Sequence, residues 1–293
     1  MNPANDSTIN SSDNLVVIAS DDDMIRVGGR SNPDKNKIVK GSSSIAKPER
    51  NLILGWNHKA EIIVREMDQY VESGSELTVV SEFSETQEIV NNLAKEMKSM
   101  TVSFVLGDTT DRDLLDSLNL PKYQHVILLC YGDNLEMQEA DSKTLMTLLH
   151  LRDIESIKGE SYSVVSEMLD VKNRALAEIA KADDFIVSDE LAGLLLTQVS
   201  ENKELGTVFD DLFDADGSEI YLKPAGEYVS IGDSMNFYTV VEAAKLRNET
   251  AIGYRIAANL DDSTQSYGIC LNPLKSTSIK FAPDDKVIVL SES

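Results

Sequence analysis

Between residues 50 and 190 the sequence alternates short apolar runs with longer segments in which apolar residues recur at helical spacing. The runs are LILGW (52–56), LTVV (77–80), VSFVLG (102–107), HVILLCY (125–131), YSVVSE (162–167) and DFIVSD (184–189). After the first run, Ile63, Met67, Tyr70 and Val71 fall on one face of a helix. Strands that are apolar on both faces and alternate with helices are typical of a parallel sheet covered on both sides. The sequence therefore predicts an α/β fold, with a doubly wound, Rossmann-like parallel sheet of six strands at residues 50–190.

The pattern changes after residue 188. The segment SDELAGLLLTQVSEN (188–202) predicts a helix, and ELGTVFDDLF (204–213) predicts a second one. The first helix is apolar over most of its circumference, so it should be buried on more than one side. We therefore expect residues 188–213 to pack against their own domain and against a second subunit. Residues 215–293 contain short strands, among them EYVSI (227–231), and one helix, which predicts a smaller α+β domain.

A short internal repeat suggests how the chain is organised. DNLVVIASD (13–21) and DKVIVLSES (285–293) share the pattern of an acid followed by a continuous apolar run. An isolated strand ahead of a segment rich in Gly, Ser and Lys is explained if it ends a preceding copy of the same unit. We therefore expect residues 1–23 to supply the terminal strand of such a copy, and residues 24–49 to be a linker or surface loop.

The chain is strongly acidic, with 27 Lys and Arg against 50 Asp and Glu and a net charge of −23. Such a surface repels nucleic-acid phosphates and anionic lipids and attracts cations, although acidity also serves solubility alone. We expect no nucleic-acid partner and no direct insertion into a membrane, since no apolar run reaches transmembrane length. Cys130 and Cys270 lie in apolar runs, which predicts buried thiols and a reducing, cytoplasmic compartment.

The junction between the first strand and its helix is where a dinucleotide-binding fold places its glycines. Here the G-x-G-x-x-G pattern becomes Gly55-Trp56-Asn57-His58-Lys59-Ala60. Side chains stand where a pyrophosphate requires bare backbone, so a bound nucleotide is disfavoured although the crevice geometry should survive.

The expected walls of that crevice are Gly55, Asn57, Glu82, Asp108 and Asp133, which follow the first four strands. Glu82 stands about where an acid would hold a ribose hydroxyl. Several carboxylates at one sheet edge favour a cation such as Ca²⁺ over a phosphate. The alternative is that these acids only form turns and cap helices.

The sequence contains no G-x-S-x-G, H-E-x-x-H, C-x-x-C or G-x-x-x-x-G-K-[ST] pattern, which favours a protein that is not an enzyme. An NAD-dependent oxidoreductase is the rival hypothesis from the enzyme class. It would need a general acid beside the nicotinamide, and the sequence offers no Tyr-x-x-x-Lys pair to supply one.

Several longer stretches resemble a known family. GDTTDRDLL (107–115) is similar to the Gly-Asp-Ala-Thr-Asp run of regulator-of-potassium-conductance (RCK) domains, and residues 188–213 are similar to their helix–turn–helix dimer bridge. ILGWNHKAEIIVREMDQYVESGSELTVVSE (53–82), FYTVVEAAKLRNETAIGYRIA (237–257) and LNPLKS (271–276) resemble the cytosolic region of Castor/Pollux ion channels and their bacterial relatives.

The resemblance implies a cytosolic gating-ring module that belongs to a cation channel at the inner face of the membrane. Such modules form dimers that build a ring beneath a pore, and this chain carries no pore domain of its own. By the matching positions, Asp108 and Asp111 are the implied cation ligands, and Gly55 is the glycine of the first turn. A nucleotide-binding peripheral subunit of a potassium uptake system is the alternative within the same class.

Overall fold

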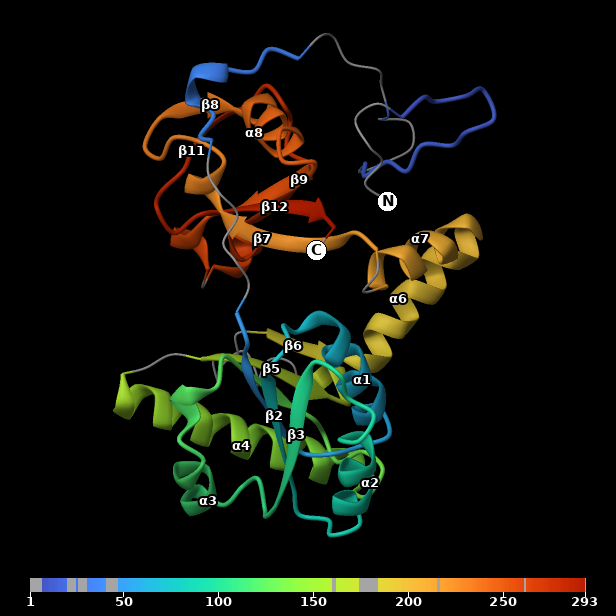
Figure 1. The fold of residues 1–293 in the computed structure, drawn as a ribbon, viewed down its shortest axis with the longest axis vertical. Coiled ribbons are helices and arrows are strands. Elements are labelled where there is room, and N and C mark those ends of the chain that lie inside the picture. The colour runs from blue at the N-terminus through green and yellow to red at the C-terminus, as the bar shows by residue number, and fades with distance from the viewer. Residues whose placement is uncertain are drawn as a thin grey trace. The chain divides into compact units, whose positions relative to one another are not determined.

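The computed structural model describes residues 7–19, 25, 31–40, 47–159, 162–173, 184–214, 217–260 and 262–292. The chain divides into two compact units. The first unit comprises residues 45–203, and the second comprises residues 1–44 together with 204–293 (Figure 1).

The first unit is built on the predicted parallel sheet. Its six strands lie in the order β3-β2-β1-β4-β5-β6, and every neighbouring pair is parallel. Each strand coincides with one of the apolar runs, which confirms the α/β prediction. The strands are β1 (Arg50–Leu54), β2 (Ser75–Ser81), β3 (Met100–Leu106), β4 (His125–Leu128), β5 (Ser163–Met168) and β6 (Asp184–Val187).

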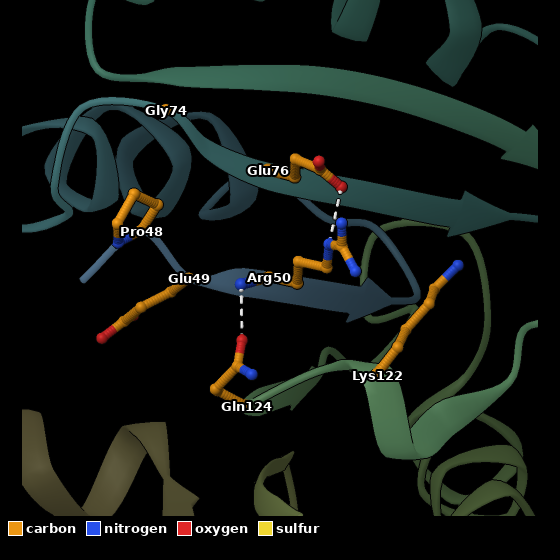
Figure 2. Close-up of a pocket in the computed structure, with 7 residues that line it drawn as sticks. All are labelled: Pro48, Glu49, Arg50, Gly74, Glu76, Lys122 and Gln124. Atoms are coloured by element: carbon orange, nitrogen blue, oxygen red, sulfur yellow. Dashed lines mark hydrogen bonds and ion pairs between the residues drawn. The ribbon is translucent and has the colours of Figure 1, made fainter.

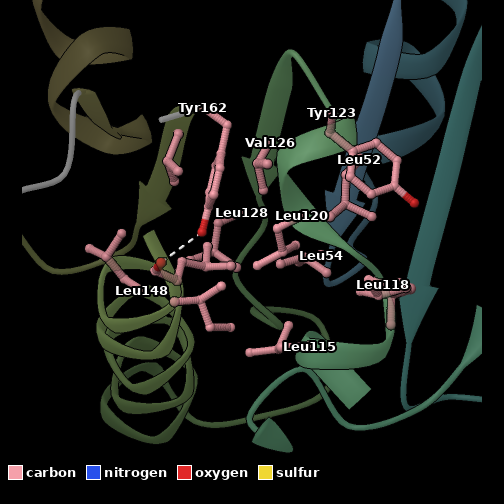
Figure 3. Close-up of a cluster of buried hydrophobic side chains, with 14 residues drawn as sticks. Leu52, Leu54, Leu115, Leu118, Leu120, Tyr123, Val126, Leu128, Leu148 and Tyr162 are labelled. Atoms are coloured by element: carbon pink, nitrogen blue, oxygen red, sulfur yellow. Dashed lines mark hydrogen bonds between the residues drawn. The ribbon is translucent and has the colours of Figure 1, made fainter. Parts of the chain in front are cut away.

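Helices cover both faces of this sheet because alternate strand residues point to opposite sides. In β1, Leu52 and Leu54 pack with residues of α3 and α4, while Ile53 packs with residues of α1 and α2. Figure 3 shows the first of these cores, in which the Tyr162 hydroxyl donates to the carbonyl of Leu151 at 2.6 Å. The helices are α1 (Ala60–Tyr70), α2 (Thr86–Leu93), α3 (Arg112–Ser117) and α4 (Met137–Lys158).

The strand order contains the reversal point at which the sequence predicts a crevice. Chain progression runs outward from β1 through β2 to β3, and then returns to the other side of β1 with β4. Open α/β sheets bind ligands outside the carboxyl ends of their strands at such a reversal. The segments after β1, β2, β3 and β4 meet at this edge.

The two helices predicted for residues 188–213 are present as α6 (Ser188–Glu201) in the first unit and α7 (Glu204–Phe213) in the second. Within the described part of one chain, α6 leaves three leucines open to solvent: Leu191 at 47%, Leu194 at 60% and Leu196 at 72%. Phe213 at the end of α7 is 59% exposed. Exposed apolar side chains such as these are available for contact with another protein surface.

The second unit contains an antiparallel sheet in the order β10-β9-β12-β7 and a two-stranded sheet of β8 and β11. Helix α8 packs on the larger sheet through Phe237 and Val240, which are fully buried with Val287 of β12. The elements are β7 (Glu219–Pro224), β8 (Ser234–Asn236), α8 (Phe237–Lys245), β9 (Thr250–Arg255), β10 (Ile269–Leu271), β11 (Ser278–Lys280) and β12 (Lys286–Ser291). The α+β expectation for this region agrees with these elements.

One predicted strand of this region is wrong. EYVSI (227–231) follows a 3₁₀ turn at Ala225–Glu227 and forms no strand; only Val229 makes an isolated bridge, to Ile38. Its apolar residues are in the core, since Tyr228 and Val229 are fully buried. A strand needs a neighbour along its whole length, and burial of this segment is achieved by a turn instead.

The assignment of the amino-terminal segments to the last strand of a preceding unit and to a linker stays a prediction. Residues 13–19 form no strand, and Leu15 to Ile18 are 48–69% exposed, because no strand among the described residues pairs with them. Within the expected linker, the 3₁₀ turn at Lys35–Lys37 docks on the second unit, where Asp34 N–H donates to the Thr239 hydroxyl at 3.0 Å. Residues 1–6, 20–24, 26–30 and 41–46 of these two segments lie outside the described residues.

In the described part of the chain, no helix combines the length and the apolar character that crossing a bilayer requires. Both cysteines are free, with Cys130 buried and Cys270 half-buried.

Candidate functional site

The turn between β1 and α1 keeps one glycine for a steric reason. Gly55 has φ = +93°, and a Cβ atom at this position would lie 2.0 Å from the carbonyl oxygen of Leu129. Only glycine fits this approach of the turn to the segment after β4. Trp56 is buried at 7% exposure, and it packs in the same core as α1.

Asn57 replaces the second glycine and binds within the protein. Its side chain is buried, and Nδ2 donates to the Cys130 carbonyl at 2.8 Å and to Glu167 Oε2 at 2.7 Å. Asn57 Oδ1 accepts from Lys59 N–H at 3.0 Å, and Lys59 Nζ lies 2.6 Å from Glu167 Oε1. Asn57, Lys59 and Glu167 therefore form a closed network across the crevice between α1 and β5.

His58 and Asp133 form a second contact across the reversal point. Asp133 Oδ2 accepts from the backbone N–H of His58 at 2.6 Å, and Oδ1 lies 2.7 Å from Nδ1 of the same histidine. Both side chains are substantially exposed. A carboxylate at the amino end of a helix takes the position that a ligand phosphate takes in nucleotide-binding folds.

Glu82 and Asp108 share a lysine. Lys143 Nζ from α4 lies 2.8 Å from Glu82 Oε1 and 3.3 Å from Asp108 Oδ1. Burial acts to raise the pKa of Asp108, but hydrogen bonds from the N–H and hydroxyl of Thr110, together with the Lys143 charge, outweigh it and lower the pKa. Burial likewise acts to lower the pKa of Lys143, and its two carboxylate partners raise it overall.

Buried polar side chains lie behind this ion pair. Tyr131 packs edge-on against Phe83 with ring centroids 5.3 Å apart, and the Lys143 ammonium lies 5.7 Å from the Tyr131 ring centre. Burial raises the pKa of Tyr131, and it raises the pKa of the neighbouring Cys130 thiol to about 12. Cys130 is therefore a protonated core thiol at neutral pH, as its apolar run predicts.

Asp111 lies apart from these contacts. It is the N-cap residue of α3, and its carboxylate accepts from the backbone N–H of Asp113 at 3.0 Å. Among the residues that the structure describes, no group of three or more His, Cys, Asp or Glu side chains is arranged to hold a metal ion. The cation site suggested for Asp108 and Asp111 stays a prediction, and the capping role that the sequence left open is what Asp111 performs here.

The structure thus brings Gly55, Asn57 and Asp133 to the β1–α1 turn, and Glu82 and Asp108 to Lys143. Sequence reasoning missed the three partners Lys59, Lys143 and Glu167. The sequence did contain a sign that Lys143 faces the protein. It lies three residues after Ala140 and four before Thr147, on the buried face of α4.

A separate cavity of about 220 Å³ lies at the opposite edge of the sheet, beside the amino ends of β1 and β2 (Figure 2). Two of its lining residues, Arg50 and Glu76, form an ion pair at 3.0 Å, and each is more than half exposed. The Arg50 backbone N–H donates to Gln124 Oε1 at 2.7 Å. These groups satisfy one another at the edge away from the crevice, so the cavity is not our candidate site.

Comparison with known proteins identifies relatives along almost the whole chain. It is 26% identical over 326 aligned positions to a probable ion channel of Pisum sativum, SYM8, which covers 99% of this chain and 36% of that protein. It is 25% identical to the ion channel CASTOR of Lotus japonicus, covering 100% of this chain and 37% of that protein. The resemblance to Castor/Pollux ion channels is thereby confirmed, and the chain spans just over a third of these relatives' length. No family model matches.

Among solved structures, the human SLO3 gating ring matches 84% of this chain and 44% of its own chain, with a TM-score of 0.53 and 12% sequence identity. At this identity the match concerns the fold. It agrees with the Rossmann-like first unit followed by a smaller α+β unit, which the sequence predicted.

Proposed function

We propose that this chain is a cytoplasmic regulatory module of a cation channel, and that it acts at the inner face of the membrane beneath a pore domain. The similarity to plant ion channels carries this proposal. Those relatives are channels, and the alignments to them include 99–100% of this chain. The gating-ring fold supports the same assignment.

The module works as a pair of subunits joined through α6 and α7. Leu194 and Leu196 of α6, together with Phe213 of α7, offer apolar side chains that one chain leaves exposed. Burying them in a second copy removes that apolar area from water and stabilises a dimer. Ligand binding then biases two arrangements of the pair, and the ring of such pairs transmits the change to the pore.

A regulatory role fits the crevice better than a catalytic one. Asn57, Glu82, Asp108 and Asp133 each contact a side chain or backbone group of the same protein. A catalytic acid or base must instead face a substrate within hydrogen-bonding distance. A divalent cation such as Ca²⁺ is the ligand class that the net charge of −23 favours over a nucleotide.

A chimeric channel tests the proposal directly. The stretch of a CASTOR channel that matches this chain is replaced by residues 1–293, and single-channel currents are recorded in planar bilayers while Ca²⁺, K⁺ or ADP is added on the cytosolic side. We expect a conducting channel whose open probability follows one of these additions. A matched chimera carrying Leu194→Asp and Leu196→Asp should conduct without that response. The proposal would be contradicted if the open probability of both chimeras stayed the same after every addition.

A further inference from the structure

Residues 32–39, which we call the strap, contact the second unit although they precede the first unit in sequence. The second unit combines residues 1–44 with residues 204–293, and the first unit, residues 45–203, stands between these two parts of the chain. The second unit is therefore discontinuous in sequence, and the strap belongs to its amino-terminal part.

The backbone of the strap pairs with the segment that follows β7. The Val39 N–H donates to the Tyr228 carbonyl at 2.9 Å, and the Ser230 N–H donates to the Lys37 carbonyl at 2.9 Å. These two hydrogen bonds flank an antiparallel bridge centred on Ile38. The residues that the sequence predicted to form a strand at this point thus meet a strand-like partner in the strap, which satisfies their backbone groups beside the core.

Side chains hold the strap at the amino end of α8. The Asp34 N–H donates to the Thr239 hydroxyl at 3.0 Å, and Asn236 Nδ2 donates to the Asn32 carbonyl at 2.9 Å. Asn236 is also the N-cap of α8, where its Oδ1 accepts from the Thr239 N–H at 3.1 Å. Ile38 packs against the core that α8 shares with the larger sheet. The strap therefore adds an apolar anchor and several hydrogen bonds to the second unit.

The chain passes from the second unit to the first within a few residues of the strap. Val39 is bonded to the second unit, whereas the Glu49 N–H donates to Ser75 Oγ at 2.9 Å in the first unit. Residues 40–48 are thus one connection between the units, and the junction at residues 203–204 is the other. The first unit is inserted into the second through these two connections.

We propose that the strap makes the second unit the receiver of movement from the chain ahead of residue 32. A pull between those residues and the carboxyl terminus loads the strap and its docking site, and it bypasses the first unit until the strap detaches. The inference concerns the strap alone and holds whether or not the chain regulates a channel.

Optical tweezers test this path on the full chain. Handles are attached through Ile25→Cys and Glu292→Cys, in a background in which Cys130 and Cys270 are replaced by serine. We expect a short first step when the strap detaches, which releases about 60 Å of chain at residues 32–49 and adds the width of the folded first unit. Unfolding of the first unit should follow as a much longer step of roughly 500 Å.

Three variants of this background locate the short step. Ile38→Asp should lose the step, because a charge replaces the apolar anchor. Asn236→Ser keeps a cap for α8 but removes the Nδ2 donor, so the step should occur at a lower force. Asn36→Asp is the matched control, because it adds the same charge at an exposed position of the strap and should behave like the background protein.

The proposal is overturned if the background protein shows no short step, or if Ile38→Asp keeps the step at the same force. It is equally overturned if Asn36→Asp loses the step as Ile38→Asp does. Circular dichroism verifies that each variant is folded. If Ile38→Asp is not folded, Asn236→Ser decides, and an unchanged force for its short step would then overturn the proposal.

Discussion

The ammonium nitrogen of Lys143 lies 2.8 Å from Glu82 Oε1 and 2.9 Å from Glu82 Oε2, and the same nitrogen reaches Asp108 at 3.3 Å. A side chain of α4 therefore occupies the space between two acids that follow β2 and β3. The acids at this sheet edge suggested a bound cation, and the protein supplies one of its own.

Replacing Lys143 by methionine should destabilise the first unit. The methionine keeps most of the side-chain length but leaves Glu82 and Asp108 without their cation. We expect the free energy of unfolding to fall by about 1–3 kcal/mol, as for other partly buried charges that lose a partner. Urea unfolding at neutral pH measures the change, and Lys95→Met, at an exposed position, should unfold like wild type.

The same variant tests the predicted cation site. With the ammonium gone, Ca²⁺ has two carboxylates to bind, so it should raise the melting temperature of Lys143→Met more than that of wild type. An equal response of both proteins would argue against a latent cation site at Glu82 and Asp108.

The lowered pKa of Asp108 predicts a pH dependence with a definite sign. Burial opposes the shift, and the Thr110 and Lys143 contacts exceed it. A carboxyl whose pKa is lower in the folded state stabilises the protein above its unfolded pKa and loses that contribution as pH falls through its folded value. The stability difference between wild type and Asp108→Asn should therefore be constant above about pH 5 and shrink below about pH 4. Urea unfolding at a series of pH values checks this; a difference that grows on acidification would be the wrong sign.

Replacing Asn57 by alanine should destabilise the protein less than replacing it by aspartate. Asn57→Ala removes the hydrogen bonds to Glu167 and the Cys130 carbonyl and should cost about 2 kcal/mol of stability. Asn57→Asp places a second carboxylate where Nδ2 lies 2.7 Å from Glu167 Oε2, so it should cost more at pH 7. Thermal unfolding of both variants ranks them, and the opposite order would show that the network is not held by the amide.

Alanine substitutions at two glycines with positive φ should distinguish the cost of a steric clash from the cost of backbone strain. Gly55→Ala places a Cβ 2.0 Å from the Leu129 carbonyl oxygen and should lower the free energy of unfolding by more than about 3 kcal/mol. Loss of soluble protein would also agree with this expectation. Gly159→Ala has φ = +68° but meets nothing within 4 Å, so only the left-handed strain of about 1 kcal/mol applies. Equal costs would mean that the turn at Gly55 can shift.

Much of the first unit could be predicted because its signal is local. An apolar run such as HVILLCY can only be buried on both faces, and alternation with helices requires parallel strands. The helices at 188–213 could also be predicted, because their apolar residues recur at helical spacing within one continuous segment. The strands β8 and β11, of three residues each, carry too little pattern to detect. The wrongly predicted strand at 227–231 shows that an apolar run need not be a strand. Tyr228 and Val229 are buried in the core, but they reach it from a turn.

The sequence indicated which side chains would gather at this sheet edge, but not which groups they would contact. Asn57, Glu82, Asp108 and Asp133 follow strand ends, and parallel strands bring such ends together. Their partners Lys143 and Glu167 come from elements 61 and 110 residues away, and only the folded chain pairs them. A list of acids therefore suggested a cation site, whereas the folded protein places Lys143 beside Glu82 and Asp108, and His58 beside Asp133.

The mass of the chain in solution, measured by light scattering during gel filtration, tests the central claim that α6 and α7 join two subunits. We expect wild type to have at least twice the 32.3 kDa of one chain, and Leu194→Asp with Leu196→Asp to be monomeric. Gln198→Asp adds a charge to the same helix at a polar position and should stay paired. A wild-type protein of 32.3 kDa at every concentration, with its α6 leucines exposed, would contradict the account.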